Sequence, residues 1–179
     1  MGANGQADLG LLLLRLVVGL LIIGHAVQKS FGWLGGDGLA TTATIFDRIG
    51  YSPGRLMVLI ASITEIVGSL LLILGAVTPI AGSVLVGVMI VACSVHWRFG
   101  IWAASRGFEL PLILAVSAAT LALVGPGRWS VDRLIGLDLP GWVSVVSLVL
   151  GCLGAAGLIG LRALRLKIDA TRPQANTVH

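Results

Sequence analysis

Long apolar stretches separated by short polar segments dominate the order of residues along this chain. Five of them reach spanning length, at roughly 9–29, 54–75, 79–98, 108–125 and 141–161. A helix rises 1.5 Å per residue, so about 20 apolar residues cross the ~30 Å hydrocarbon core of a bilayer. The pattern therefore predicts an all-α integral membrane protein built as a bundle of about five transmembrane helices.

Residues that start or stop helices lie at the edges of these stretches. Ser52-Pro53 and Thr78-Pro79 have the order of an N-cap followed by proline, which suits the first turn of a helix. Gly125-Pro126-Gly127 is expected to end the fourth span. Residues 31–52 begin with several glycines, which predicts a glycine turn followed by a short interfacial or re-entrant helix over 39–49.

The composition agrees with a lipid environment. Of 179 residues, 56% are hydrophobic and 11% are charged, which is about half the charge of an ordinary soluble domain. The mean hydropathy is +1.00, and the length suits one domain. The first apolar run is expected to stay in the mature protein, because it has no basic n-region and carries Arg15.

Positive residues are distributed unevenly between the two ends of the expected spans. Most belong to the 27–54 loop, the 98–107 loop and the C-terminal segment, namely Lys29, Arg48, Arg98, Arg106, Arg162, Arg165, Lys167 and Arg172, with Arg55 at the adjoining helix edge. The opposite side carries only Arg128 and Arg133, beside Asp132 and Asp138. The positive-inside rule therefore predicts a bacterial inner-membrane protein with its N-terminus outside and its C-terminus in the cytoplasm. This pattern indicates topology rather than nucleic-acid binding.

Ionisable residues at membrane depth are the candidate functional residues. They are Arg15, His25 and Lys29 on one face of the first helix, Glu65 in the second span, His96 at the end of the third and Glu109 at the start of the fourth. Charges at this depth normally face a partner or a cavity. Two interpretations stay open: buried ion pairs that fix the helix register, or a polar pocket for a quinone head group, another small ligand or a proton relay.

Metal binding and cysteine chemistry are not indicated by the spacing of the relevant residues. His25, Glu65, His96 and Glu109 are suitable ligand types, but no Glu-x-x-His pair occurs and their expected depths differ by about two helical turns. Cys93 and Cys152 fall on different spans without a CxxC motif, so we expect them to pack as small apolar side chains.

The fifth span differs from the others because it has a repeat of small residues and no charge. Gly151, Gly154, Gly157 and Gly160 recur every three residues, which allows another helix to approach closely. This groove is expected either to pack against the remaining helices or to dock onto another membrane subunit.

The ordered set of motifs resembles the DoxX/DoxD family of small bacterial membrane proteins over about residues 9–133. The matching pieces are Arg15, Gly24-His25 with Lys29, the glycine-aromatic segment from Phe31, Glu65 before Gly68, His96 before Gly100, Gly107-Phe108-Glu109-Leu110-Pro111 and the segment Gly125–Asp132. The resemblance implies a DoxX-like four-helix membrane domain over 9–133. The fifth helix at 141–161 and a basic cytoplasmic tail at 162–179 extend beyond it.

The resemblance also implies an association with redox systems. The leading hypothesis is a membrane partner or anchor subunit of a quinone-linked or thiol/oxidative-stress redox complex. A quinone-reactive oxidoreductase subunit with an intramembrane proton-handling pocket is the first alternative, and a small-solute or proton conductor is the second. The sequence contains no recognisable cofactor-binding motif, and quinone is the candidate cofactor that the resemblance implies. Whether the chain is catalytic and whether it forms a homo-oligomer are left open.

Overall fold

The computed structural model describes residues 3–171, and all the regular secondary structure in this range is helical. The helices are α1 (Ala3–Phe31), α2 (Gly38–Arg48), α3 (Gly54–Leu74), α4 (Thr78–His96), η1 (Trp97–Phe99), η2 (Ala103–Ser105), α5 (Glu109–Val124), α6 (Val131–Leu134) and α7 (Gly141–Thr171). The expected all-α fold is confirmed, and so is the short helix after the glycine turn, which is α2.

Four of the helices are long and apolar enough to cross a membrane: α1, α3, α4 and α7. The predicted span at 108–125 corresponds to α5, which has 16 residues. Its length is about 24 Å at 1.5 Å per residue, which is shorter than a typical hydrocarbon core. The chain is therefore an all-α membrane protein, in which the shorter apolar helix α5 packs among the spanning helices.

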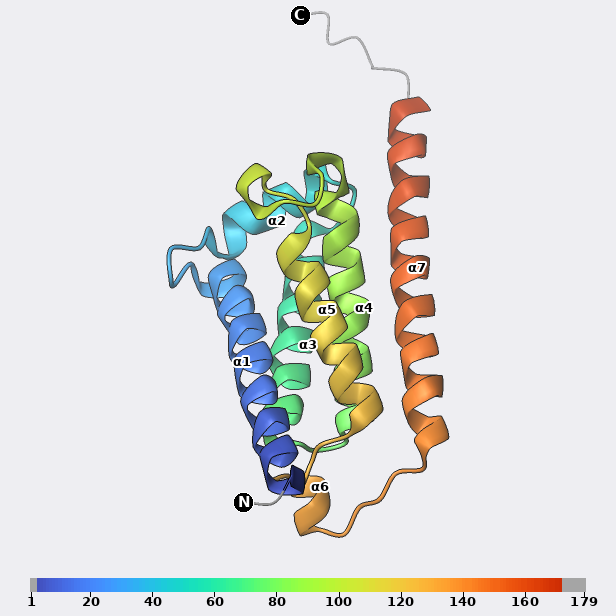
Figure 1. The fold of residues 1–179 in the computed structure, drawn as a ribbon. Helices are drawn as coiled ribbons and strands as arrows, with labels where there is room; N and C mark the ends of the chain where they lie inside the picture. The colour runs from blue at the N-terminus through green and yellow to red at the C-terminus, as the bar shows by residue number, and fades with distance from the viewer. Residues whose placement is uncertain (1–2, 172–179) are drawn as a thin grey trace, which may run out of the picture.

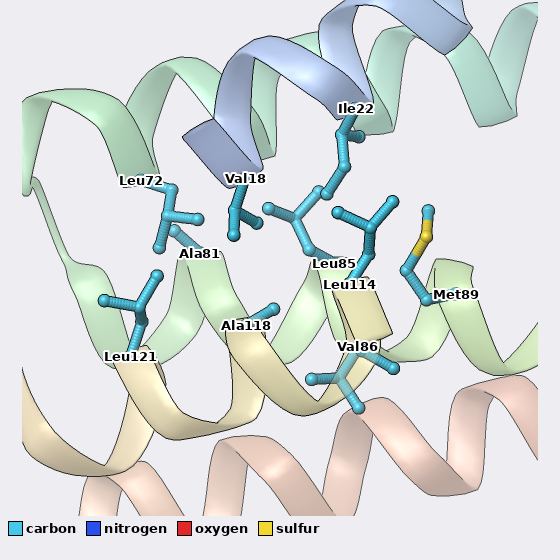
Figure 2. Packing of buried hydrophobic residues seen from close by; sticks show 11 residues of the cluster. Val18, Ile22, Leu72, Ala81, Leu85, Val86, Met89, Leu114, Ala118 and Leu121 are labelled. Carbon is cyan, nitrogen blue, oxygen red and sulfur yellow. The ribbon is translucent and has the colours of Figure 1, made fainter. Parts of the chain in front are cut away.

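The helices α1, α3, α4 and α5 form one bundle, with each packed on the next in that order. The helix α7 lies outside this bundle and packs mainly on α4 (Figure 1). The main apolar core lies between the four bundle helices, where Ile22 of α1 and Leu72 of α3 meet Leu85 of α4 and Leu121 of α5 (Figure 2). These four side chains are completely buried.

The connections divide between the two ends of the bundle. The α2 segment, the loop with η1 and η2, and the C-terminal end of α7 lie at one end, whereas α6 lies beside the N-terminal end of α1 at the other (Figure 1). The expected grouping of the basic segments at one end is thus confirmed. The side of the membrane on which that end lies remains a prediction.

Two helix starts differ from the sequence prediction. Neither Ser52 nor Thr78 caps its helix through its side chain. Instead Asp47 Oδ1 accepts from the Gly54 N–H at 2.7 Å, and Asp132 Oδ1 accepts from the Val77 N–H at 2.8 Å. Both N-cap predictions were wrong because carboxylates brought in by the tertiary fold satisfy the free N–H groups of the first turn.

The last helix is longer than expected. The predicted fifth span ended at 161 and a basic tail followed, but α7 continues to Thr171. Its final turns pack on the loop before α3, where Arg162 Nε donates to the Ile49 carbonyl at 2.7 Å and Leu166 lies against Gly50. The expected tail therefore begins as helix, and its part at 172–179 lies outside the described residues.

Candidate functional site

An ion pair joins α1 to α3 inside the bundle. Lys29 Nζ lies 2.6 Å from Glu65 Oε1. The Glu65 side chain is 4% exposed and the Lys29 side chain 25% exposed, so the acid is inside the protein while the base reaches its edge. Because Glu65 is near the middle of the spanning helix α3, this pair carries charge deep into the membrane domain.

His25 lies one helical turn before Lys29 on α1. Its Nδ1 is 3.2 Å from Gln28 Oε1, and Gln28 Nε2 donates to the Leu34 carbonyl at 3.0 Å. His25 is also close enough to Glu65 to attract it electrostatically when the imidazole is charged. The end of α1 therefore places two basic side chains around one buried carboxylate.

Several buried polar atoms near this pair have no hydrogen-bond partner in the protein. They are Glu65 Oε2 and the hydroxyl oxygens of Ser62 and Ser69. The three residues are spaced by three and four positions, so they lie on one face of α3. Each is at most 3% exposed. Ser62 was not among the candidate residues predicted from the sequence, although its spacing of three positions from Glu65 was a usable signal.

Arg15 belongs to the opposite end of the bundle. It precedes Lys29 by fourteen residues, which is about 21 Å along α1. Arg15 is fully buried, and its Nη2 donates to the Trp129 carbonyl at 2.6 Å. Asp132 is near enough to attract it electrostatically, whereas Arg15 Nε and Nη1 have no acceptor in the protein. Arg15 therefore holds the segment after α5 against α1.

His96 and Glu109 both support the loop between α4 and α5. His96 Nδ1 lies 2.9 Å from the Arg106 carbonyl. Glu109 Oε2 accepts from the Ala103 N–H at 2.8 Å. The rings of Trp97 and Phe108 stack across the same loop with centroids 4.9 Å apart. These contacts give both residues a local structural role at the basic end.

The structure therefore distributes the six candidate residues over three places. Lys29 and Glu65 contact each other, and His25 lies beside this pair. Arg15 lies at the far end of the bundle. His96 and Glu109 support the loop between α4 and α5. The Lys29–Glu65 contact is an ion pair, as one of the two interpretations of the sequence expects, whereas a polar pocket lined by these residues stays a prediction. Within residues 3–171, no three His, Cys, Asp or Glu side chains lie close enough to hold a metal ion.

Two apolar grooves lie on the outer surface of α4. One has a volume of about 270 Å³ and lies between α3 and α4, lined by Ile63, Thr64, Val67, Gly68, Leu71, Ile80, Ala81 and Val84. The other, of about 180 Å³, lies between α4 and α7 and is lined by residues that include Val84, Gly87 and Gly154. None of the six ionisable candidates lines either groove, and both linings are mainly apolar.

The glycine repeat of α7 is divided between two environments. Gly151 packs against α4, where an added Cβ would strike the Ser83 carbonyl. Ser147 reinforces this contact, with its hydroxyl 3.0 Å from that of Ser83. An added Cβ at Gly154, Gly157 or Gly160 would meet nothing within 4 Å. Gly151 therefore packs inside the chain and Gly154 borders the α4–α7 groove, while Gly157 and Gly160 lie on an uncovered face.

Comparison with protein families supports the resemblance inferred from the motifs. The family model described as DoxX matches residues 10–97, which cover α1 to α4 and include Arg15, His25, Lys29, Glu65 and His96. This part of the chain is therefore similar to the DoxX family. The match does not extend to α5, α6 or α7. No curated protein and no solved structure matched the chain.

Proposed function

We propose that this chain is a membrane-embedded partner or anchor subunit of a redox complex. The observation that carries the proposal is the exposure of α7. Only 11% of the most apolar stretch of this helix is buried inside the protein, against 28% to 50% of the corresponding stretches of the other three spanning helices. A helix that packs on α4 but has so few buried residues, and that carries uncovered glycines, is well suited to pack on a second membrane protein as well.

The family assignment guides the choice of partner. DoxX-like proteins are associated with quinone-linked and thiol or oxidative-stress systems, so we propose a partner that carries a redox cofactor or a reactive dithiol. The proposed orientation places the basic end of the bundle in the cytoplasm, following the positive-inside rule. In this arrangement α1 to α5 form the rigid body and α7 supplies the docking surface.

Purification from native membranes in mild detergent tests this proposal. Gly157→Leu would fill the uncovered face of α7, where nothing lies within 4 Å. Val145→Leu is the matched control, because Val145 is also exposed but lies about 120° around the helix from Gly157. The wild type and Val145→Leu should retain a protein with a redox cofactor or dithiol, and Gly157→Leu should lower its recovery severalfold. Equal recovery from all three, or capture of no redox protein, would contradict the proposal.

A second candidate is a quinone-reactive subunit, favoured by two features of α3. The Lys29–Glu65 pair offers a proton-handling group inside the membrane domain, and the α3–α4 groove offers an apolar surface for an isoprenoid tail. Val67→Phe should fill this groove and reduce the quinone that is extracted with the purified protein. The control Val116→Phe changes an exposed side chain of α5 instead. Unchanged quinone in the Val67 variant would argue against this role.

A further inference from the structure

The face of α3 that meets α1 carries polar atoms that the protein itself leaves unpaired. Glu65 Oε2, Ser62 Oγ and Ser69 Oγ are buried and have no hydrogen-bond partner in the protein. Buried polar atoms in folded proteins are almost always hydrogen-bonded, to the protein or to ordered water. Three unpaired atoms on one helix face therefore indicate a hydrated seam.

The two serines also differ from Ser83 and Thr120, two other hydroxyl residues in the apolar helices. Ser83 donates to the Pro79 carbonyl at 2.6 Å, and Thr120 donates to the Val116 carbonyl at 2.9 Å. Such backbone bonds to a preceding turn are the usual solution for a hydroxyl within an apolar helix. Ser62 and Ser69 do not make them, which leaves both hydroxyls free to bond water beside Glu65.

The two ends of this seam between α1 and α3 differ in their exposure. At one end Lys29 is 25% exposed, and the hydroxyl of the adjacent Ser30 is another buried atom without a partner. Toward the other end α1 and α3 approach closely, because a Cβ added to Gly19 would lie 3.2 Å from the Ser69 carbonyl oxygen and would strike the Ile73 side chain. The buried guanidinium of Arg15 follows beyond this contact, and a fixed cation repels protons.

The charged groups around Glu65 come mainly from α1. Lys29 and His25 act on it directly. On α2 the nearest acid in sequence to α3, Asp47, is occupied by the Gly54 N–H. The helices α4 and α5 carry acidic or basic side chains only near their ends, His96 and Glu109. No other carboxylate of these helices therefore lies at the depth of Glu65, where it could compete with Glu65 for a proton.

We propose that Glu65, Ser62 and Ser69 form a hydrated proton-binding site that opens at the Lys29 end and is closed at the Arg15 end. A proton delivered by water binds Glu65 Oε2, while Oε1 keeps its bond from Lys29 Nζ. The pair changes from neutral to singly positive, and the positive charge stays on Lys29 at the protein edge. This site does not depend on the redox partner, since every group in it belongs to this chain.

Infrared spectroscopy of the purified chain in nanodiscs tests the site. A carboxylic C=O band should appear as the pH is lowered, shift in D₂O and be absent from Glu65→Gln. Ser62→Ala and Ser69→Ala should each move the band, because they remove hydrogen-bonding groups from the seam. Ser83→Ala is the matched control, since that hydroxyl bonds to Pro79 and Ser147, and it should leave the band in place.

The contrary results are equally specific. A band that is absent from the wild type, or that ignores both seam serines, would overturn the hydrated site. If Glu65→Gln fails to fold, Glu65→Asp replaces it and should shift the band. In vesicles of one orientation, the band should respond to the pH on the Lys29 side. A response to the pH on the Arg15 side would overturn the closed end.

Discussion

Asp132 holds Thr78 at the first turn of α4 from 54 residues further along the chain. Its Oδ2 accepts from the Thr78 backbone N–H at 3.2 Å and from the Thr78 hydroxyl at 3.4 Å. Asp132 is 3% exposed and also lies near the buried Arg15. One carboxylate therefore caps a helix and balances a cation, and α6 connects α1 to the α3–α4 turn.

Replacing Asp132 should weaken the whole domain. Asp132→Ala removes the cap of α4, and it also leaves Arg15 without its nearby carboxylate. Loss of a cap costs about 0.5–2 kcal/mol, and an unpaired buried charge adds to it, so we expect a loss of about 2–4 kcal/mol in unfolding free energy. Thermal unfolding in detergent measures this. Asp138→Asn, at an exposed acid in the following loop, should change stability by less than about 0.5 kcal/mol. Similar losses in both variants would contradict the capping role.

The Lys29–Glu65 pair predicts an order of stabilities. Lys29→Met should be the most damaging change, because it leaves a nearly inaccessible carboxylate without its cation. Breaking a buried pair costs about 3–5 kcal/mol. Glu65→Gln should be milder, because Lys29 can extend to the membrane surface. The double variant should regain much of the loss caused by Lys29→Met. Additive losses in this double-mutant cycle would show that the two side chains are not coupled.

Alanine substitutions at Gly75 and Gly136 distinguish the stability cost of backbone strain from the cost of a steric clash. Both have positive φ, at +64° and +69°, so alanine at either should cost about 1–2 kcal/mol. An added Cβ at Gly75 would also strike the Arg15 guanidinium, whereas an added Cβ at Gly136 would meet nothing within 4 Å. Gly75→Ala should therefore lower the unfolding temperature clearly more than Gly136→Ala. Equal shifts would mean that Arg15 moves away without cost.

Membrane orientation is tested by labelling single cysteines at opposite ends of the bundle. Leu134, which is 84% exposed, lies in α6, and Lys167 lies near the end of α7. In a background without Cys93 and Cys152, an impermeant thiol reagent added to spheroplasts should modify Leu134→Cys. Lys167→Cys should react only after lysis. The reverse result would place the basic end outside and would contradict the positive-inside prediction.

Local patterns along the chain were sufficient to predict much of the fold. The apolar runs gave α1, α3, α4 and α7, and Gly125 ends α5 as expected. The distribution of Lys and Arg gave the grouping of loops at one end. These features are readable because the bilayer requires about 20 apolar residues per span and keeps charges at its edges. The family resemblance was also visible in the sequence, through ordered motifs over about residues 9–133.

Tertiary structure decided which polar groups meet. The sequence placed Arg15, Lys29 and Glu65 at membrane depth, but only the packing of α1 on α3 selects Lys29 as the partner of Glu65. It likewise brings Asp132 to α4 from 54 residues away. The spacing of residues along a helix fixes the face on which a side chain lies, but not the neighbouring helix. Long-range pairing depends on how whole helices pack and rotate, which no local pattern records.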